Sequence, residues 1–137
     1  MNYKSFFDKL PCLVLIVDES TKIINVNDAW VSILGWDKSE LIGHRFMDFI
    51  HPADHVKTFN IIDKMYMYPI TKFKNRYKCK KISAQNVNAM LPGGYVELEW
   101  ESNIWENGTT IATARLHERP ASIEDYSAVS LESTRKK

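Results

Sequence analysis

Two short apolar runs near the N-terminus predict a pair of antiparallel strands. Residues 13–17 (LVLIV) are apolar and bounded by Pro11 and Asp18, as in a short buried strand. The polar residues 18–21 follow, and residues 22–26 resume an apolar pattern. We therefore expect a hairpin whose two strands are joined by this polar loop.

Several short helical patterns follow this hairpin. Residues 29–34 place Trp30, Ile33 and Leu34 on one helical face. The side chain of Asn27 or Asp28 is suited to cap its first turn, and Gly35 is a typical left-handed terminator.

Three more helical segments complete this part of the chain. Residues 39–43 (SELIG) form one turn that closes in Gly, and the aromatic pair in FMDFI keeps helical spacing. A longer helix begins at 51–52, with Pro52 in its first turn, and is expected to run to about Met67, since Pro69 follows.

Strict alternation predicts the remaining strands. In residues 71–80, Phe73, Asn75, Tyr77 and Cys79 share one face, and basic residues occupy the other. Residues 95–102 alternate apolar and acidic positions, which predicts that this strand pairs with the basic one. The Asn-Gly pair at 107–108 favours a hairpin turn, so residues 109–116 form the last strand.

This order of elements predicts an α+β fold. We expect a five-stranded antiparallel sheet, with several short helices and one longer helix packed on one face. The predicted domain covers residues 1–119, and residues 120–137 form a C-terminal linker or tail. Residues 81–94 are an inserted loop between the third and fourth strands.

Composition narrows the range of partners and locations. The 137 residues suit one domain, and 18 basic against 17 acidic residues give a net charge of +1. This balance provides no basis for nucleic-acid binding. No apolar run is long enough to span a bilayer, and the N-terminus has no signal-peptide core. We therefore expect a cytoplasmic location. The two cysteines, Cys12 and Cys79, are too few for a disulfide framework and are expected to be reduced thiols.

Several pieces of the sequence, in this order, resemble the PAS family of sensor domains. They are VDESTKIINVNDAW, LGWDKSELIG, FMDFIHPAD, FKNRYKCK and GGYVELEW, between about Phe6 and Glu118. The resemblance implies a sensory or dimerising module of a larger signalling protein, such as a two-component system, with no enzymatic activity of its own.

The chain departs from the family pattern in two places. Residues 81–94 replace a short turn; they are a tolerated surface loop, or Met90 and Leu91 in them cover a pocket or a partner surface. At the C-terminus, Pro120 interrupts any continuous helix, so a separate short helix over 123–131, capped by Ser122, is expected.

Cofactor chemistry finds little support in the residues. His51 and His55 lie four apart, but a metal site needs a third ligand, so no metal is predicted. Haem-binding relatives use a His on the long helix, where His55 is the candidate. Flavin photochemistry in the family needs a Cys that residues 43–48 lack, although Trp30 and Trp100 could line a site for non-covalent flavin. No cofactor is predicted; haem and non-covalent flavin are the alternatives.

The leading functional hypothesis is a regulatory domain that binds a small apolar ligand or a protein partner and signals to an output module. The alternative is a structural dimerisation domain with a filled core. The sequence contains no recognisable nucleophile or acid–base motif, so we do not predict an enzyme. A homodimer through the sheet face or the termini is expected. The candidate pocket residues, with Asn75 and Tyr77 as its polar groups, are Trp30, Phe46, Phe49, Phe59, Ile62, Asn75, Tyr77 and Trp100.

Overall fold

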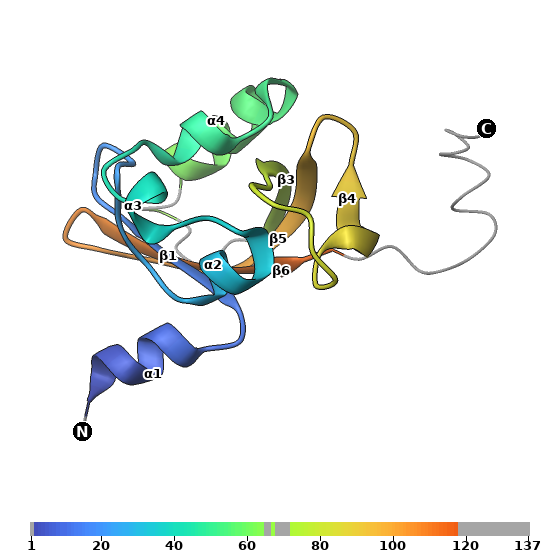
Figure 1. Cartoon of the computed structure of the whole chain (residues 1–137). Helices are drawn as coiled ribbons and strands as arrows, with labels where there is room; N and C mark the ends of the chain where they lie inside the picture. The colour runs from blue at the N-terminus through green and yellow to red at the C-terminus, as the bar shows by residue number, and fades with distance from the viewer. Residues whose placement is uncertain (1, 65–66, 68–71, 118–137) are drawn as a thin grey trace.

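An antiparallel sheet of six strands forms the centre of the computed structural model, which describes residues 2–64, 67 and 72–117 (Figure 1). The strand order is β2-β1-β6-β5-β3, and β4 pairs with β5. With its helices, the sheet confirms the α+β class. The strands are β1 (Leu13–Val17), β2 (Ile23–Val26), β3 (Phe73–Lys78), β4 (Met90–Leu91), β5 (Tyr95–Glu106) and β6 (Thr109–Leu116).

The strand β4 corrects the prediction of five strands. It lies in the inserted segment 81–94, which is therefore more than a loop. Met90 and Leu91 pair with Val96 and Tyr95 at the start of β5. The partner β6 contacts β5 only further along the strand. This end of β5 would otherwise lack a neighbour on that side, and β4 satisfies its backbone groups.

The predicted pairing of the basic and acidic strands is confirmed. In the β3–β5 register, Lys74 lies opposite Glu99 and Arg76 lies opposite Glu97. The Lys74 ammonium is 4.0 Å from the Glu99 carboxylate. Arg76 instead turns to Asp54, whose Oδ1 is 2.9 Å from its Nη2. Opposite charges across the two strands thus favour this register, although Arg76 forms its ion pair with a residue outside the sheet.

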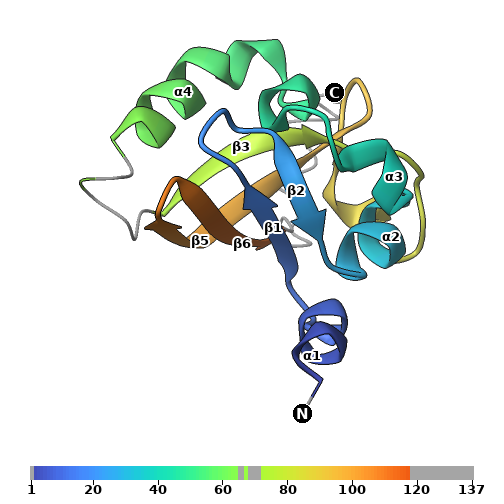
Figure 2. The ribbon, with the colours of Figure 1, turned by 90° about the vertical axis from the view of Figure 1, so that its left-hand side faces the viewer.

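The helices between β2 and β3 pack on one face of the sheet (Figures 1 and 2). Their buried residues join those of the sheet in a single core. This arrangement agrees with the predicted layers. The helical elements are α1 (Tyr3–Lys9), α2 (Ala29–Leu34), α3 (Lys38–Leu41), α4 (His55–Asp63) and the short 3-10 turns η1 (Phe46–Phe49), η2 (Pro52–Asp54) and η3 (Val87–Ala89).

Helix α4 is shorter than the sequence predicted. It ends at Asp63 rather than near Met67, and the Lys64 amide closes it with 3-10 contacts to the last turn. Thr58 is its one buried residue. Because packing supplies most of the stability of a helix in a protein, a helix so poorly buried gains little from another turn.

Asn27 and Gly35 bound α2 in different ways. Gly35 ends the helix in the left-handed region as predicted, with φ of 79°. The predicted side-chain cap is wrong: Asp28 is the N-cap residue and its side chain forms no capping hydrogen bond. Asn27 is fully buried instead, because its side chain accepts from the Val14 amide and donates to the Cys12 carbonyl. It joins α2 to the entry of β1.

No helix in the described part of the chain is long and apolar enough to cross a membrane. The predicted break at Pro120, the cap at Ser122, the helix over 123–131 and the tail as a whole lie outside the described residues.

Candidate functional site

A cavity of about 500 Å³ lies between α4, η1 and the sheet. Strands β1, β5 and β6 form its floor, and α4 forms part of its wall. The turns after β1 and between β5 and β6 form part of its mouth. Its lining residues are Leu15, Val17, Asp18, Glu19, Ser20, Thr21, Arg45, Phe46, Met47, Phe59, Ile62, Asp63, Phe73, Trp100, Gly108, Thr110 and Ala112.

Aromatic side chains give the cavity its apolar interior. The Trp100 ring stacks with Phe73 at a centroid distance of 6.1 Å and meets Phe46 edge-on at 5.3 Å. The Trp100 Nε1 donates a hydrogen bond of 2.9 Å to the Asn75 Oδ1. This buried bond fixes the plane of the indole, because a lost partner would leave the N–H unsatisfied. The cavity therefore offers a preformed aromatic surface.

Charged side chains lie at the mouth of the cavity. Three are carboxylates, Asp18, Glu19 and Asp63, and one is the guanidinium of Arg45. The Asp18 Oδ1 accepts hydrogen bonds from the Ser20 hydroxyl and from the Ser20 and Lys22 amides. These bonds lower the pKa of Asp18, the Ser20 hydroxyl most of all, because they stabilise its charged form. The mouth is thus polar and predominantly acidic.

Four of the eight predicted pocket residues line this cavity. They are Phe46, Phe59, Ile62 and Trp100. The other four, Trp30, Phe49, Asn75 and Tyr77, do not belong to its lining.

Tyr77 and Asn75, expected as polar contacts to a ligand, are buried in the core. Tyr77 packs 5.0 Å from the Trp30 ring and stacks on Phe49 at 5.7 Å. Burial raises the pKa of its hydroxyl well above the ordinary value. The Asn75 amide donates to the Thr58 hydroxyl and accepts from Trp100. Both side chains thus act within the core, behind the aromatic wall of the cavity.

Phe59 corrects the expectation of an inward-facing α4. Its side chain is 60% exposed, although the sequence placed it in the core. Thr58 is the buried residue of that turn, and Ile62 is half-buried against the core. The helix is thus rotated so that Phe59 lies at the open side of the cavity. Helical spacing identifies the residues that share a face, but it does not say how deeply that face is buried.

His55 does not line the cavity. Its Nε2 lies 2.8 Å from the carbonyl oxygen of Ile50, which precedes η2, so this ring nitrogen is already engaged. The Nδ1 of His51 accepts a hydrogen bond from the Ala53 amide. Among residues 2–64, 67 and 72–117, no three His, Cys, Asp or Glu side chains come together in a way that could hold a metal ion.

The sequence also marks some cavity residues that are absent from the predicted pocket. Alternation in β1 places Leu15 and Val17 on one face, and alternation in β6 does the same for Thr110 and Ala112. The acidic mouth carried no such signal, because its carboxylates come from the turn after β1 and from the end of α4, which are far apart in the sequence. Only the folded arrangement brings them together.

Comparison with known proteins identifies the fold. Residues 2–67 match the family model described as PAS fold. The PAS domain of a Colwellia psychrerythraea protein superposes with a TM-score of 0.68 at 15% identity, covering 86% of this chain and 96% of that one. No curated protein matches the chain.

Two further structural neighbours are sensory domains. The PAS domain of the Cronobacter turicensis RpfR quorum-sensing receptor, in complex with BDSF, has a TM-score of 0.60 at 14% identity, covering 79% and 95% of the two chains. The photoactive yellow protein domain of the sensor histidine kinase Ppr from Rhodospirillum centenum has a TM-score of 0.55 at 18% identity, covering 84% and 93%. The resemblance to the PAS family is confirmed: residues 2–67 match its model, and the described residues have its fold.

Proposed function

We propose that this PAS-fold chain is a sensory domain that binds a small, largely apolar ligand and regulates an attached output module. PAS domains form a family of sensory and signalling domains. The cavity of about 500 Å³ between α4 and the sheet carries the proposal, since small-molecule sites occupy roughly 300–1,000 Å³. The proposal assigns no catalytic reaction to the chain.

The alternative, a structural dimerisation domain, requires a filled core. The open cavity favours the ligand-binding function. A ligand that covers the exposed Phe59 and the half-buried Phe73 would remove apolar surface from water, which is energetically favourable. Dimerisation is still compatible with sensing. We include a homodimer in the proposal.

Strand β6 is the proposed route of the signal. Thr110 and Ala112 line the cavity, and the same strand ends at Leu116, which packs against the core. A ligand that changes how β6 packs therefore acts on the point where the chain leaves the sheet. Such a ligand shifts the population of two arrangements by its differential affinity for them.

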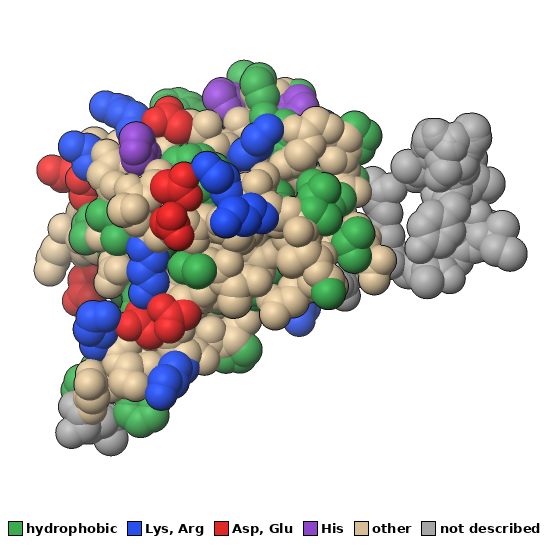
Figure 3. Space-filling view, in the orientation of Figure 1, with side chains coloured by type: hydrophobic (Ala, Val, Ile, Leu, Met, Phe, Trp, Pro, Cys, Tyr) green, Lys and Arg blue, Asp and Glu red, His purple; other side chains and the backbone are tan. Residues whose placement is uncertain are grey.

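The proposal includes a cytoplasmic location and no nucleic-acid partner, and the surface and the thiols of the domain support both. On the face seen in Figure 3, Lys and Arg side chains lie among Asp and Glu side chains rather than in a basic patch. This supports a domain that does not bind nucleic acid. Cys12 and Cys79 are both free, which supports a reducing, cytoplasmic location.

Filling the cavity tests the proposal. Ala112 is 8% exposed and lines the floor, so we expect Ala112→Phe to abolish binding of 1-octanol in calorimetric titration. The matched control Ala53→Phe adds the same ring at an exposed position outside the cavity and is expected to bind like the wild type. Circular dichroism checks that both variants fold. If the wild type binds neither octanol nor octyl compounds with charged head groups, the proposed function is wrong.

A further inference from the structure

The cavity combines two features that together favour one class of ligand. Its wall contains four aromatic rings, Phe46, Phe59, Phe73 and Trp100. Its mouth carries three carboxylates against one guanidinium. Aromatic faces attract organic cations through the ring quadrupole, and carboxylates attract them by charge.

Two of the three carboxylates at the mouth have no ion-pair partner among the residues that the structure describes, and the third, Asp18, has the ammonium of Lys22 near it. Among the described residues, Glu19 and Asp63 take part in no ion pair, and the same holds for Arg45. Asp18 is bonded to a hydroxyl and to backbone amides, which leave its charge in place. The four charged side chains that line the cavity, three negative and one positive, carry a net charge of −2, and Lys22 lies beside this lining without belonging to it.

This charge lies where the polar end of a ligand must sit. The apolar body of a ligand fits against the aromatic wall and the floor at Leu15 and Ala112, and its head group then remains among the carboxylates. An anionic head would meet repulsion from three of the four charged side chains. A cationic head would meet attraction from the same three.

We infer that the cavity is selective for amphiphilic organic cations, such as alkylammonium compounds, over alkyl carboxylates. The inference rests on the proposed function, since it names the ligand class of the same cavity. It also assigns roles: the aromatic wall holds the alkyl chain, and Glu19 and Asp63 determine the preferred head group.

Three probes with the same eight-carbon chain test this inference. They are octyltrimethylammonium, 1-octanol and octanoate, titrated calorimetrically into the full chain at neutral pH. We expect octyltrimethylammonium to bind at least about tenfold more tightly than octanoate, because net opposite charge favours it and net like charge opposes the carboxylate. Its advantage should shrink as sodium chloride rises from about 20 to about 500 mM, because the mouth is open to screening by salt.

A charge-matched pair of variants assigns the preference to the mouth. Glu19→Gln with Asp63→Asn removes two charges there, and we expect the preference for the cation to fall several-fold while octanol binding stays unchanged. Glu97→Gln with Glu99→Gln removes the same charge from residues outside the cavity lining, and the preference should persist. Asp18 is left intact because its hydrogen bonds hold the turn after β1.

The outcomes separate this inference from the proposed function. Octanoate binding as tightly as the cation, or a preference untouched by Glu19→Gln with Asp63→Asn, overturns the inference, while octanol binding alone leaves the ligand-binding function standing. If none of the three probes binds, both fail.

Discussion

Gly35 and Gly43 adopt the same kind of backbone conformation but have different surroundings. Both have positive φ, 79° and 92° respectively. A Cβ at Gly35 would lie 2.6 Å from the Lys81 Cβ and 3.0 Å from its backbone nitrogen, whereas a Cβ at Gly43 would meet nothing within 4 Å. The close contact at Gly35 is with the inserted segment, so this glycine serves both the end of α2 and the packing of residues 81–94.

These two glycines form a matched pair for measurement. We expect Gly43→Ala to lower the free energy of unfolding by about 1 kcal/mol, the cost of the left-handed conformation. Gly35→Ala should cost more, about 2–4 kcal/mol, because overpacking against Lys81 is added to that strain. Urea unfolding of both variants measures the difference. Equal losses would mean that Lys81 moves away freely.

The ion pair of Asp54 and Arg76 predicts how stability depends on pH. The Asp54 Oδ2 accepts hydrogen bonds from the Arg76 amide at 2.7 Å and its Nε at 3.0 Å. The side-chain bond from Arg76 is the largest of the effects that lower the pKa of Asp54 from 3.8 to about 2. A carboxyl with a depressed pKa in the folded protein stabilises it above the unfolded-state value and loses this contribution as the pH falls through the folded value.

We therefore expect about 2 kcal/mol of stability to disappear between about pH 4 and pH 2 through Asp54 alone. Asp54→Asn should lose stability at neutral pH and show a flatter pH dependence across that interval. Urea unfolding at several pH values compares the two slopes. A slope that is the same in Asp54→Asn and in the wild type would contradict the assignment.

Asn86 holds the inserted segment against the rest of the fold. Its side chain is fully buried. Its Nδ2 donates to the carbonyls of Ile33 at 2.7 Å and Lys81 at 2.8 Å, and its Oδ1 accepts from the Ser83 amide. The polar composition of residues 81–94 predicted a surface loop, since composition does not distinguish an exposed Asn from one whose hydrogen bonds are all internal.

Replacing Asn86 should therefore cost far more than replacing its neighbour. We expect Asn86→Ala to cost about 2–3 kcal/mol, because it leaves buried backbone groups without partners. Asn88→Ala, two residues away and exposed, should change stability by less than about 0.5 kcal/mol. Thermal unfolding compares the two, and hydrogen exchange at the β4 amides shows whether that strand loosens in Asn86→Ala. Similar effects of both substitutions would indicate that residues 81–94 are a surface loop that tolerates substitution.

The sheet was more predictable than the helices. Alternation placed β3 and β5, because each strand has one buried and one solvated face, and their opposite charges predicted the pairing. The apolar run of β1 gave both of its ends. Helix α1 was missed because its apolar side chains are exposed: Tyr3 is 76% and Phe6 is 60% exposed. Such a helix has no core-facing pattern for sequence analysis to detect.

The candidate site was predictable only in part, for a reason of geometry. Trp100 and Phe46 were identified by aromatic character and by the faces they share, and both contribute to the cavity. Tyr77 has the same aromatic character and shares the same face, but it lies behind the cavity in the core. The face of a strand does not say how deeply a side chain is buried. The acidic mouth depends on the approach of separate turns: a Cβ at Gly108 would lie 3.2 Å from the Glu19 carboxylate.

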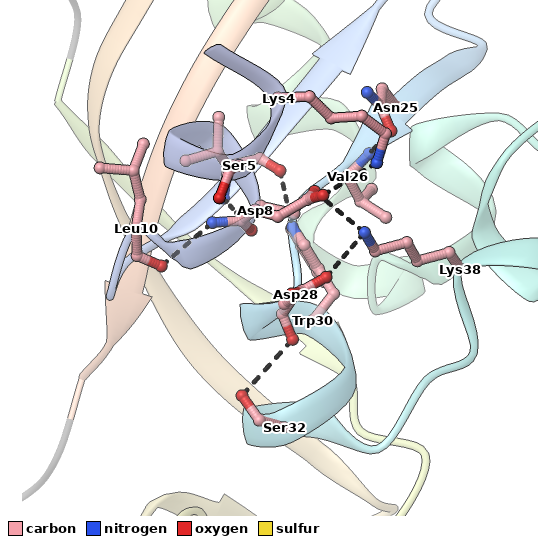
Figure 4. Close-up of polar contacts among 12 residues, drawn as sticks. Lys4, Ser5, Asp8, Leu10, Asn25, Val26, Asp28, Trp30, Ser32 and Lys38 are labelled. Carbon is pink, nitrogen blue, oxygen red and sulfur yellow. Dashed lines mark hydrogen bonds and ion pairs between the residues drawn. The ribbon is translucent and has the colours of Figure 1, made fainter. Parts of the chain in front are cut away.

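Helix α1 is attached to the body at its C-terminal end and exposes apolar side chains elsewhere. Lys38 binds both Asp8, at 3.0 Å, and Asp28, at 2.8 Å (Figure 4). Figure 2 shows the helix projecting from the rest of the fold. Its seven residues include none that is buried, and isolated helices shorter than about 12–15 residues are marginal in water. A second copy of the chain, packed on Tyr3 and Phe6, would supply the missing burial.

We therefore expect a homodimer that depends on α1. Light scattering coupled to size-exclusion chromatography should give the mass of two chains for the wild type at about 50 μM. The double variant Tyr3→Ser with Phe6→Ser should give the mass of one, because two exposed aromatic side chains supply most of the apolar area of this helix. Val56→Ser provides the control: it removes an apolar side chain that is 74% exposed on α4, and its mass should remain that of the dimer. The double variant should still fold, since α1 contributes nothing to the core. A wild type that elutes with the mass of one chain, or a double variant that remains dimeric, would show that α1 is not the interface and would turn attention to the outer face of the sheet.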